Sequence, residues 1–263
     1  MEKKRKKRIP KFKIKTKHIL IFLIVISFIA SYFFPGVGAN ETIQNSITFI
    51  GLLFGIIGGF FITDLYTRYQ GIRSNAAVDS SCLTTFYGFA KILGKKNKKW
   101  LQKQRNLIND YIHKFMPLPW EKYGQTEPEF SAIVDSLGEI KYGVNDVKEN
   151  ETYSNILAVV STHSDARERL VMYGKDKLSW AEWLVIFILA ILLIGSLFYV
   201  KDTTTVSIIF TGSLCSAILI LLFFIRDLNN LNFGEQAVSI SPYERVLDAI
   251  GKPRYYRKKG DII

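Results

Sequence analysis

The sequence predicts an all-α integral membrane protein with four transmembrane helices and a helical cytoplasmic domain inserted between the second and third. Four apolar stretches divide the 263 residues, and a helix needs roughly 20 apolar residues to cross the hydrocarbon core of a bilayer. Of the 35 Lys and Arg residues, 34 lie in segments that an alternating topology places on one side. Loops rich in Lys and Arg stay cytoplasmic, so both termini are expected inside the cell membrane.

The predicted spans are residues 19–34, 43–65, 180–200 and 206–225. The first stops at Pro35 and is only 16 residues long, about 24 Å of helix, so the flanking Lys17 and His18 must reach toward the interface. A cleaved signal peptide is the alternative for this stretch, because the small residues of 37–39 follow it. The apolar run is longer than the usual signal-peptide core, which favours a span.

The outer loops are expected at residues 35–41 and 201–205, which hold a single basic residue, Lys201. The domain boundaries that follow are 1–18 for a basic cytoplasmic tail, 19–65 and 180–225 for the two pairs of spans, 66–179 for the inserted domain and 226–263 for the C-terminal segment. Residues 1–17 carry ten basic side chains and one acidic one. Anionic headgroups attract each such charge by about 1 kcal/mol, so lipid explains the net charge of +12 without nucleic acid.

The inserted segment is predicted to be helical throughout. Its first helix continues from the second span, because no Pro or turn cluster separates them and apolar residues recur at helical steps; these are Ile72, Ala76, Leu83, Phe86 and Ala90. Further helices are predicted over 101–115, over 130–140 and from Tyr153 onward. The last is expected to run through Lys177 directly into the third span. The cluster at 95–99 is expected to be an exposed loop between two helices.

No residue pattern in the chain is typical of catalysis, so the sequence predicts neither an enzyme nor a cofactor. Cys82 and Cys215 are not spaced as metal ligands and are not expected to form a disulfide. His18, His113 and His163 are isolated from one another and from either cysteine, and they are expected to be surface or interface residues. Neither a phosphate-binding loop nor a nucleophile elbow occurs, and no metal site is predicted.

The second span carries an unusual strip of glycines. They recur at every fourth position with one extra beside the last, namely Gly51, Gly55, Gly58 and Gly59. A strip without side chains on one helix face is typical of close helix packing.

A neighbouring row, Leu52, Ile56 and Phe60, repeats at the same interval. Around an axis shared by several copies, this row would form apolar rings of the kind that gate ions by dewetting. Contact with lipid is the alternative.

Two short motifs resemble bestrophin channels. Gly59-Phe60-Phe61-Ile62-Thr63, followed by Thr67-Arg68-Tyr69, resembles the end of the second bestrophin helix. By that match Leu52, Ile56 and Phe60 fall on the three apolar neck positions that line the bestrophin pore. The segment Asn230-Leu231-Asn232-Phe233-Gly234-Glu235 resembles the one that follows the last bestrophin helix. The fuller match is to the bestrophin-like family of bacterial membrane proteins, whose members share the arrangement of spans and insert.

The resemblance implies a homopentamer in a bacterial inner membrane, with the second spans lining a central ion pore whose inner end lies near Asp64 and Arg68. It does not carry over calcium gating, because 236–239 is Gln-Ala-Val-Ser where animal bestrophins have an acidic run. The spans also lack the midplane carboxylates that coupled carriers need, so a channel is expected rather than a carrier. Residues 66–179 hold 17 basic and 13 acidic residues, a surplus that favours anions weakly. A non-conducting scaffold that binds a partner through its cytoplasmic helices remains the alternative.

Overall fold

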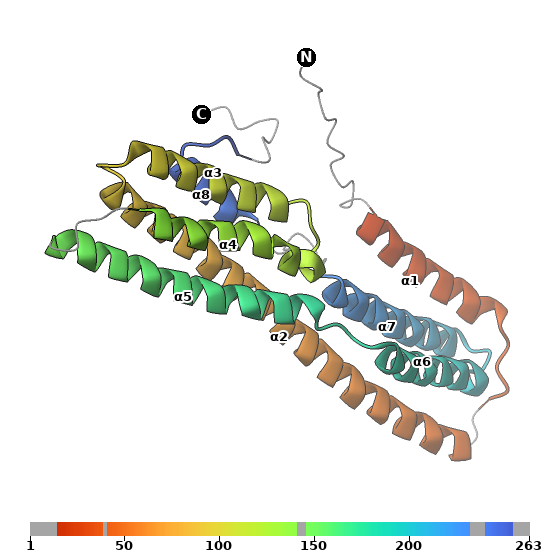
Figure 1. The fold of residues 1–263 in the computed structure, drawn as a ribbon. Helices are drawn as coiled ribbons and strands as arrows, with labels where there is room; N and C mark the ends of the chain where they lie inside the picture. The colour runs from red at the N-terminus through yellow and green to blue at the C-terminus, as the bar shows by residue number, and fades with distance from the viewer. Residues whose placement is uncertain (1–14, 39–40, 141–145, 232–239, 255–263) are drawn as a thin grey trace. The chain divides into compact units, whose positions relative to one another are not determined.

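The computed structural model describes residues 15–38, 41–140, 146–231 and 240–254, and these residues form α-helices and two short 3-10 helices with no strand among them (Figure 1). The predicted all-α class is therefore confirmed for the described chain. The chain divides into two compact units, each made of two segments. The first unit comprises Met1–Tyr66 and Leu178–Ala237, and the second comprises Thr67–Lys177 and Val238–Ile263.

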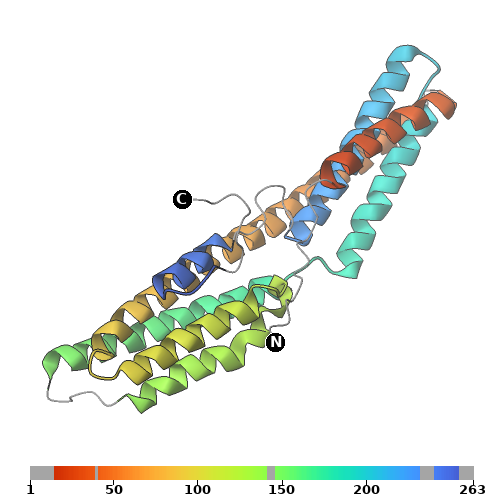
Figure 2. The ribbon, with the colours of Figure 1, turned by 90° about the horizontal axis from the view of Figure 1, so that it is seen from above.

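The first unit contains α1 (Lys15–Phe33), the beginning of α2 (Glu41–Leu93), α6 (Trp180–Val200) and α7 (Thr205–Asn229). Its core is apolar and comes from three of these helices, with Phe54 on α2, Ile186 on α6 and Ile225 on α7 among the buried residues. Helix α1 lies along α7, as both ribbon views show (Figures 1 and 2). The Ser31 hydroxyl on α1 donates a hydrogen bond of 2.7 Å to the carbonyl of Ile208 on α7.

Three helices among the described residues are long and apolar enough to cross a membrane: Ile43–Leu93, Trp180–Val200 and Thr205–Asn229. The apolar stretch of α1, His18–Phe33, is shorter, so the predicted first span stays a prediction. Helix α2 extends past the predicted span that ends at Leu65, as the sequence predicts. Its 53 residues reach about 80 Å, far more than the roughly 30 Å of hydrocarbon, so only part of it is needed to span.

The second unit contains the rest of α2 together with α3 (Lys98–Phe115), the 3-10 helix η1 (Trp120–Thr126), α4 (Glu127–Asp135), the 3-10 helix η2 (Ser136–Glu139), α5 (Val147–Lys175) and α8 (Ser241–Ala249). Helix α2 buries here the set predicted from its periodicity, namely Ile72, Ala76, Leu83, Phe86 and Ala90. The predicted helices over 101–115 and 130–140 correspond to α3 and to α4 with η2.

The prediction that the last inserted helix runs directly into the third span is wrong. Helix α5 ends at Lys175 and α6 begins at Trp180. The break has a local cause, because Ser179 and Glu182 form a capping box: the Ser179 side chain accepts from the Glu182 N–H, and the Glu182 carboxylate accepts from the Ser179 N–H. These side chains satisfy backbone N–H groups that the first turn of a helix leaves without partners. They therefore favour the start of a new helix, α6, at this point.

The C-terminal helix α8 was not predicted from the sequence. It begins with Pro at its first turn and buries Tyr243, Val246 and Leu247 in the second unit. The Arg105 guanidinium on α3 donates to the carbonyl of Gly251 just after α8, and the Lys252 ammonium donates to Asn106 on α3 at 3.0 Å. The segment at 236–239, where the calcium-binding run is lacking, lies outside the described residues, as does most of the basic tail.

Candidate functional site

The predicted neck residues are exposed in the single chain, although all three are apolar. The exposed fractions are 59% for Leu52, 48% for Ile56 and 70% for Phe60. Each follows the previous one by four residues on α2, so the three side chains stack along one face of the helix. This face contributes nothing to the core of its own chain, and it is available to lipid, to another copy or to a pore.

The glycine strip beside this row divides into two pairs. A Cβ added at Gly58 would lie 3.5 Å from a methyl of Leu221 on α7, and one at Gly51 would lie 3.8 Å from a methyl of Leu193 on α6. A Cβ added at Gly55 or Gly59 would meet nothing within 4 Å. Gly51 and Gly58 therefore face the neighbouring helices of the same chain, whereas Gly55 and Gly59 face outward beside the exposed row.

Polar residues flank the apolar row on the same helix. Toward the N-terminal end, the polar Asn45 and Ser46 line a hollow in the surface together with the apolar Phe49 and Ile50. Toward the other end, the Thr63 hydroxyl donates to the carbonyl of Gly59 at 2.9 Å, which keeps this polar side chain compatible with a helix. The row is therefore an apolar segment between two more polar ones.

The two residues predicted at the inner end of the pore differ in exposure. Asp64 is exposed, whereas Arg68 is only 2% exposed. In the second unit, Arg68 Nε donates to the carbonyl of Tyr173 at 2.7 Å and Nη2 donates to that of Gly174 at 3.1 Å. These carbonyls belong to the last turn of α5, where a cation also complements the helix dipole. The Arg68 guanidinium thus holds the end of α5.

Lys201, the single basic residue of the predicted outer loops, is also buried. Its ammonium donates to the carbonyls of Ser31 and Phe34 at the end of α1, the second at 2.5 Å. The last carbonyls of a helix have no partner within the helix, so this ammonium caps α1. Gly36 passes so close to the Lys201 carbonyl that any Cβ there would overlap it.

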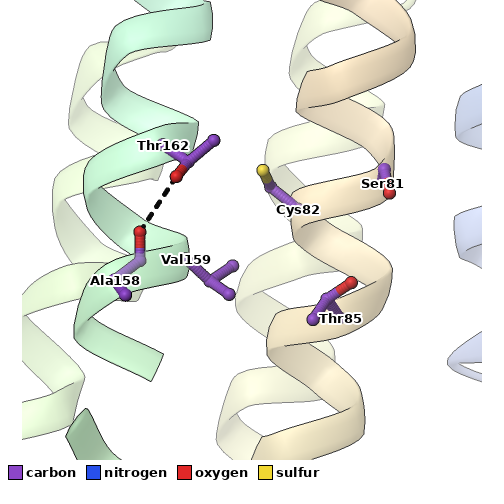
Figure 3. Close-up of a pocket in the computed structure, with 6 residues that line it drawn as sticks. All are labelled: Ser81, Cys82, Thr85, Ala158, Val159 and Thr162. Carbon is purple, nitrogen blue, oxygen red and sulfur yellow. Dashed lines mark hydrogen bonds between the residues drawn. The ribbon is translucent and has the colours of Figure 1, made fainter. Parts of the chain in front are cut away.

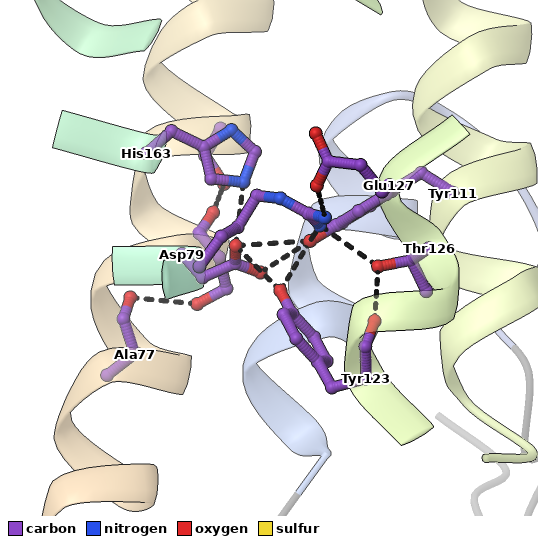
Figure 4. Close-up of polar contacts among 10 residues, drawn as sticks. Ala77, Asp79, Tyr111, Tyr123, Thr126, Glu127 and His163 are labelled. Atoms are coloured by element: carbon purple, nitrogen blue, oxygen red, sulfur yellow. Dashed lines mark hydrogen bonds and ion pairs between the residues drawn. The ribbon is translucent and has the colours of Figure 1, made fainter. Parts of the chain in front are cut away.

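The second unit contains a buried polar cluster centred on Asp79 (Figure 4). Asp79 Oδ1 lies 2.7 Å from His163 Nε2, and the carboxylate accepts from the hydroxyls of Tyr123 at 2.9 Å and Tyr111 at 3.2 Å. The Tyr243 hydroxyl of α8 faces the same carboxylate without completing a hydrogen bond of ordinary geometry. The expectation that His163 is a surface or interface residue is wrong, because the imidazole is buried against Asp79.

Arg167 extends this cluster toward the surface. Its Nη1 donates to the Tyr111 hydroxyl at 2.7 Å and to the Thr126 hydroxyl at 3.0 Å, and its Nη2 pairs with Glu127 at 2.9 Å. The cluster therefore links α2, α3, α4, α5 and η1. Each buried polar group is costly unless it is paired, so these contacts require one specific packing of the second unit.

A shallow groove runs between α2 and α5 in the second unit (Figure 3). It has a volume of about 190 Å³ and is lined by small side chains: Ser81, Cys82, Thr85, Ala158, Val159 and Thr162. Burial raises the pKa of the Cys82 thiol, and the nearby Asp79 adds to this effect. Both cysteines are free. The described residues contain no group of His, Cys, Asp and Glu side chains that could hold a metal ion.

The fold defines a helical membrane protein with several apolar helices and a second, polar helical unit. A family model described as the bestrophin-like domain matches residues 19–243. The chain therefore belongs to the bestrophin-like family. No curated protein matches the sequence.

Solved structures resemble the chain in fold at low identity. A bacterial bestrophin homologue from Klebsiella pneumoniae, carrying a point mutation, aligns with a TM-score of 0.66 at 12% identity over 89% of this chain and 99% of that one. Two further structures, each described as a membrane protein with a point mutation, align at 12% and 10% identity with TM-scores of 0.60 and 0.62. They cover 89% of this chain and 98% and 97% of their own.

Proposed function

We propose that this protein is an ion channel of the bestrophin-like family, in which several copies surround a pathway lined by α2. The observation that carries this proposal is the outward-facing row Leu52, Ile56 and Phe60. The chain leaves this row without a partner, while the glycines at 51 and 58 bring α2 close to α6 and α7 on the other side. The row coincides with the positions that the family resemblance assigns to the pore neck.

A single copy has no central pathway, so conduction requires assembly. The family resemblance favours a homopentamer in the bacterial inner membrane with both termini in the cytoplasm, and the second unit then lies on the cytoplasmic side. In such an assembly each neck residue forms one apolar ring, and rings of that kind exclude ions when they dewet. Apart from anionic lipid at the N-terminal tail, the expected partners are other copies and the permeant ion.

The test is a planar-bilayer recording of the purified protein and of the triple variant Leu52→Ala, Ile56→Ala and Phe60→Ala. Each truncation widens the predicted neck and eases its hydration, so conductance should rise. Since the row is exposed, the substitutions should cost little in fold stability. The matched control truncates three exposed residues on one side of α6, namely Leu184, Ile188 and Ile191, and should leave conductance unchanged.

The oligomeric mass of each variant, measured by light scattering with correction for detergent, shows whether assembly is intact. Wild-type currents in a correctly assembled triple variant would remove the row from the pathway. A stable monomer of about the 30.1 kDa chain mass that carries no current would instead favour the non-conducting scaffold.

A further inference from the structure

The membrane part of α2 has an unusual distribution of charge. From Glu41 to Tyr66 it contains two carboxylates, Glu41 and Asp64, and no Lys, Arg or His. Both carboxylates are exposed. Between them every side chain is uncharged, and the apolar row Leu52, Ile56 and Phe60 lies in the middle. The only fixed charges of this segment are therefore negative and stand at its two ends.

Helical geometry relates both carboxylates to that row. Glu41 precedes Leu52 by 11 residues, or about three turns, so the two positions lie within about 20° of each other around the axis. Asp64 follows Phe60 by the same four-residue step that separates the row's own members. At 1.5 Å per residue the two carboxylates are about 35 Å apart along the helix, close to the thickness of a bilayer core.

Two basic residues near the ends of this segment are committed to other contacts. Arg68 is the first basic residue after Asp64, and its buried guanidinium donates to the carbonyls at the end of α5. Lys201 is the single basic residue of the predicted outer loops, and its ammonium caps α1. Each is bound to backbone carbonyls of its own unit. The exposed surface of this part of α2 thus offers carboxylates to an approaching ion.

We propose that Glu41 and Asp64 select cations over anions at the outer and inner ends of the pathway. This inference rests on the proposed function, since it requires that the row face a pore. With several copies around one axis, each carboxylate becomes a ring, and rings of Asp or Glu favour cations whereas rings of Lys or Arg favour anions. The basic surplus of the inserted segment is spread over its length and is too dilute to reverse this local field.

The experiment measures reversal potentials in bilayers under a KCl gradient, for the wild type and for Asp64→Asn, Glu41→Gln and the double variant. The wild type should pass K⁺ over Cl⁻ by roughly tenfold, in line with the concentration of counter-ions in charged clefts. Each single neutralisation should lower the permeability ratio, and the double variant should bring it close to one. Asp64→Lys should shift the ratio toward Cl⁻, whereas Asp64→Glu should retain the preference for K⁺.

Asp135→Asn is the matched control, because Asp135 is an exposed carboxylate on α4; this variant should keep the wild-type ratio. Light scattering identifies the variants that assemble with the wild-type mass. A wild-type channel that prefers Cl⁻ would overturn the inference while leaving the proposed function intact, as would an unchanged ratio in a correctly assembled double variant. The complete absence of current in assembled wild-type protein would overturn the proposed function, and this inference with it.

Discussion

Replacing Asp79 by Asn tests whether the buried polar cluster holds the second unit together. The substitution conserves volume, so it creates no cavity. It removes a buried negative charge that faces His163 at 2.7 Å and accepts two tyrosine hydroxyls. An Asn side chain has one acceptor oxygen in place of two, and leaving a buried donor of this cluster unsatisfied costs about 1–3 kcal/mol. For a unit of this size such a loss lowers the midpoint of thermal unfolding by roughly 4–10 °C.

The pH dependence of this effect has a defined sign. Burial alone raises the pKa of Asp79, but the charge and hydrogen bond of His163, helped by the tyrosine hydroxyls, outweigh it and hold the pKa below its ordinary value. A carboxyl with a depressed pKa in the folded state stabilises the protein above its unfolded pKa of about 3.9, and this contribution is lost as the pH falls through the folded pKa. The difference between wild type and Asp79→Asn should therefore be full at pH 7 and shrink in acid.

The assay is the thermal midpoint of the full chain in detergent, monitored as the loss of the folded species on size exclusion. Asp165→Asn makes the same chemical change at an exposed position of α5, two residues after His163. Its effect on the free energy of unfolding should be no more than about 0.5 kcal/mol, with a correspondingly small shift of the midpoint. If Asp79→Asn destabilised the protein no more than Asp165→Asn does, the cluster would not be a major source of stability.

Three further substitutions test the membrane unit. Gly58→Leu should lower the thermal midpoint, because overpacking against Leu221 costs about 1–3 kcal/mol. Gly55→Leu should leave that midpoint unchanged and reduce the oligomeric mass measured by light scattering. An intact oligomer of Gly55→Leu would show that this outer strip makes no contact between copies. Lys201→Met should destabilise the fold by about 1–3 kcal/mol and lower the midpoint, because the carbonyls of Ser31 and Phe34 lose their donor. The control is Lys99→Met, at an exposed position. An equal effect from the control would contradict a capping role for Lys201.

Apolar periodicity predicted most of the helices because each of them buries a regular stripe of side chains. The buried set on the second part of α2 is one such case, from Ile72 to Ala90. The break between α5 and α6 depends instead on two side chains, Ser179 and Glu182. The periodicity of apolar residues does not mark the residue at which a helix ends. The spacing of Ser179 and Glu182 is a capping-box signal that could have located the break.

The buried cluster could not be predicted because its members lie far apart in the chain. Asp79 and His163 are 84 residues apart, and neither sits in a local motif. Asp79 is a charge on an otherwise apolar stripe of α2, which indicates a buried partner without identifying it. The short α8 was missed for a related reason, since its few apolar residues become a core face only when the second unit is assembled around Tyr243.

The candidate pore face was located from the sequence, but its exposure required the structure. In its second part α2 buries its apolar residues against its own chain, whereas Leu52, Ile56 and Phe60 in the first part remain uncovered.

Substitutions in the second part of α2 therefore test the fold of the chain, and substitutions in the first part test what the exposed row contacts. A change at Ile72 or Asp79 acts on the fold of one chain, and any loss of conductance that follows is indirect. A change in the exposed row leaves the core of the chain intact, so its effect reports what covers that row. An altered conductance without altered stability or mass is the result expected of a pore-lining residue. Altered mass with unaltered stability is the result expected of a contact between copies.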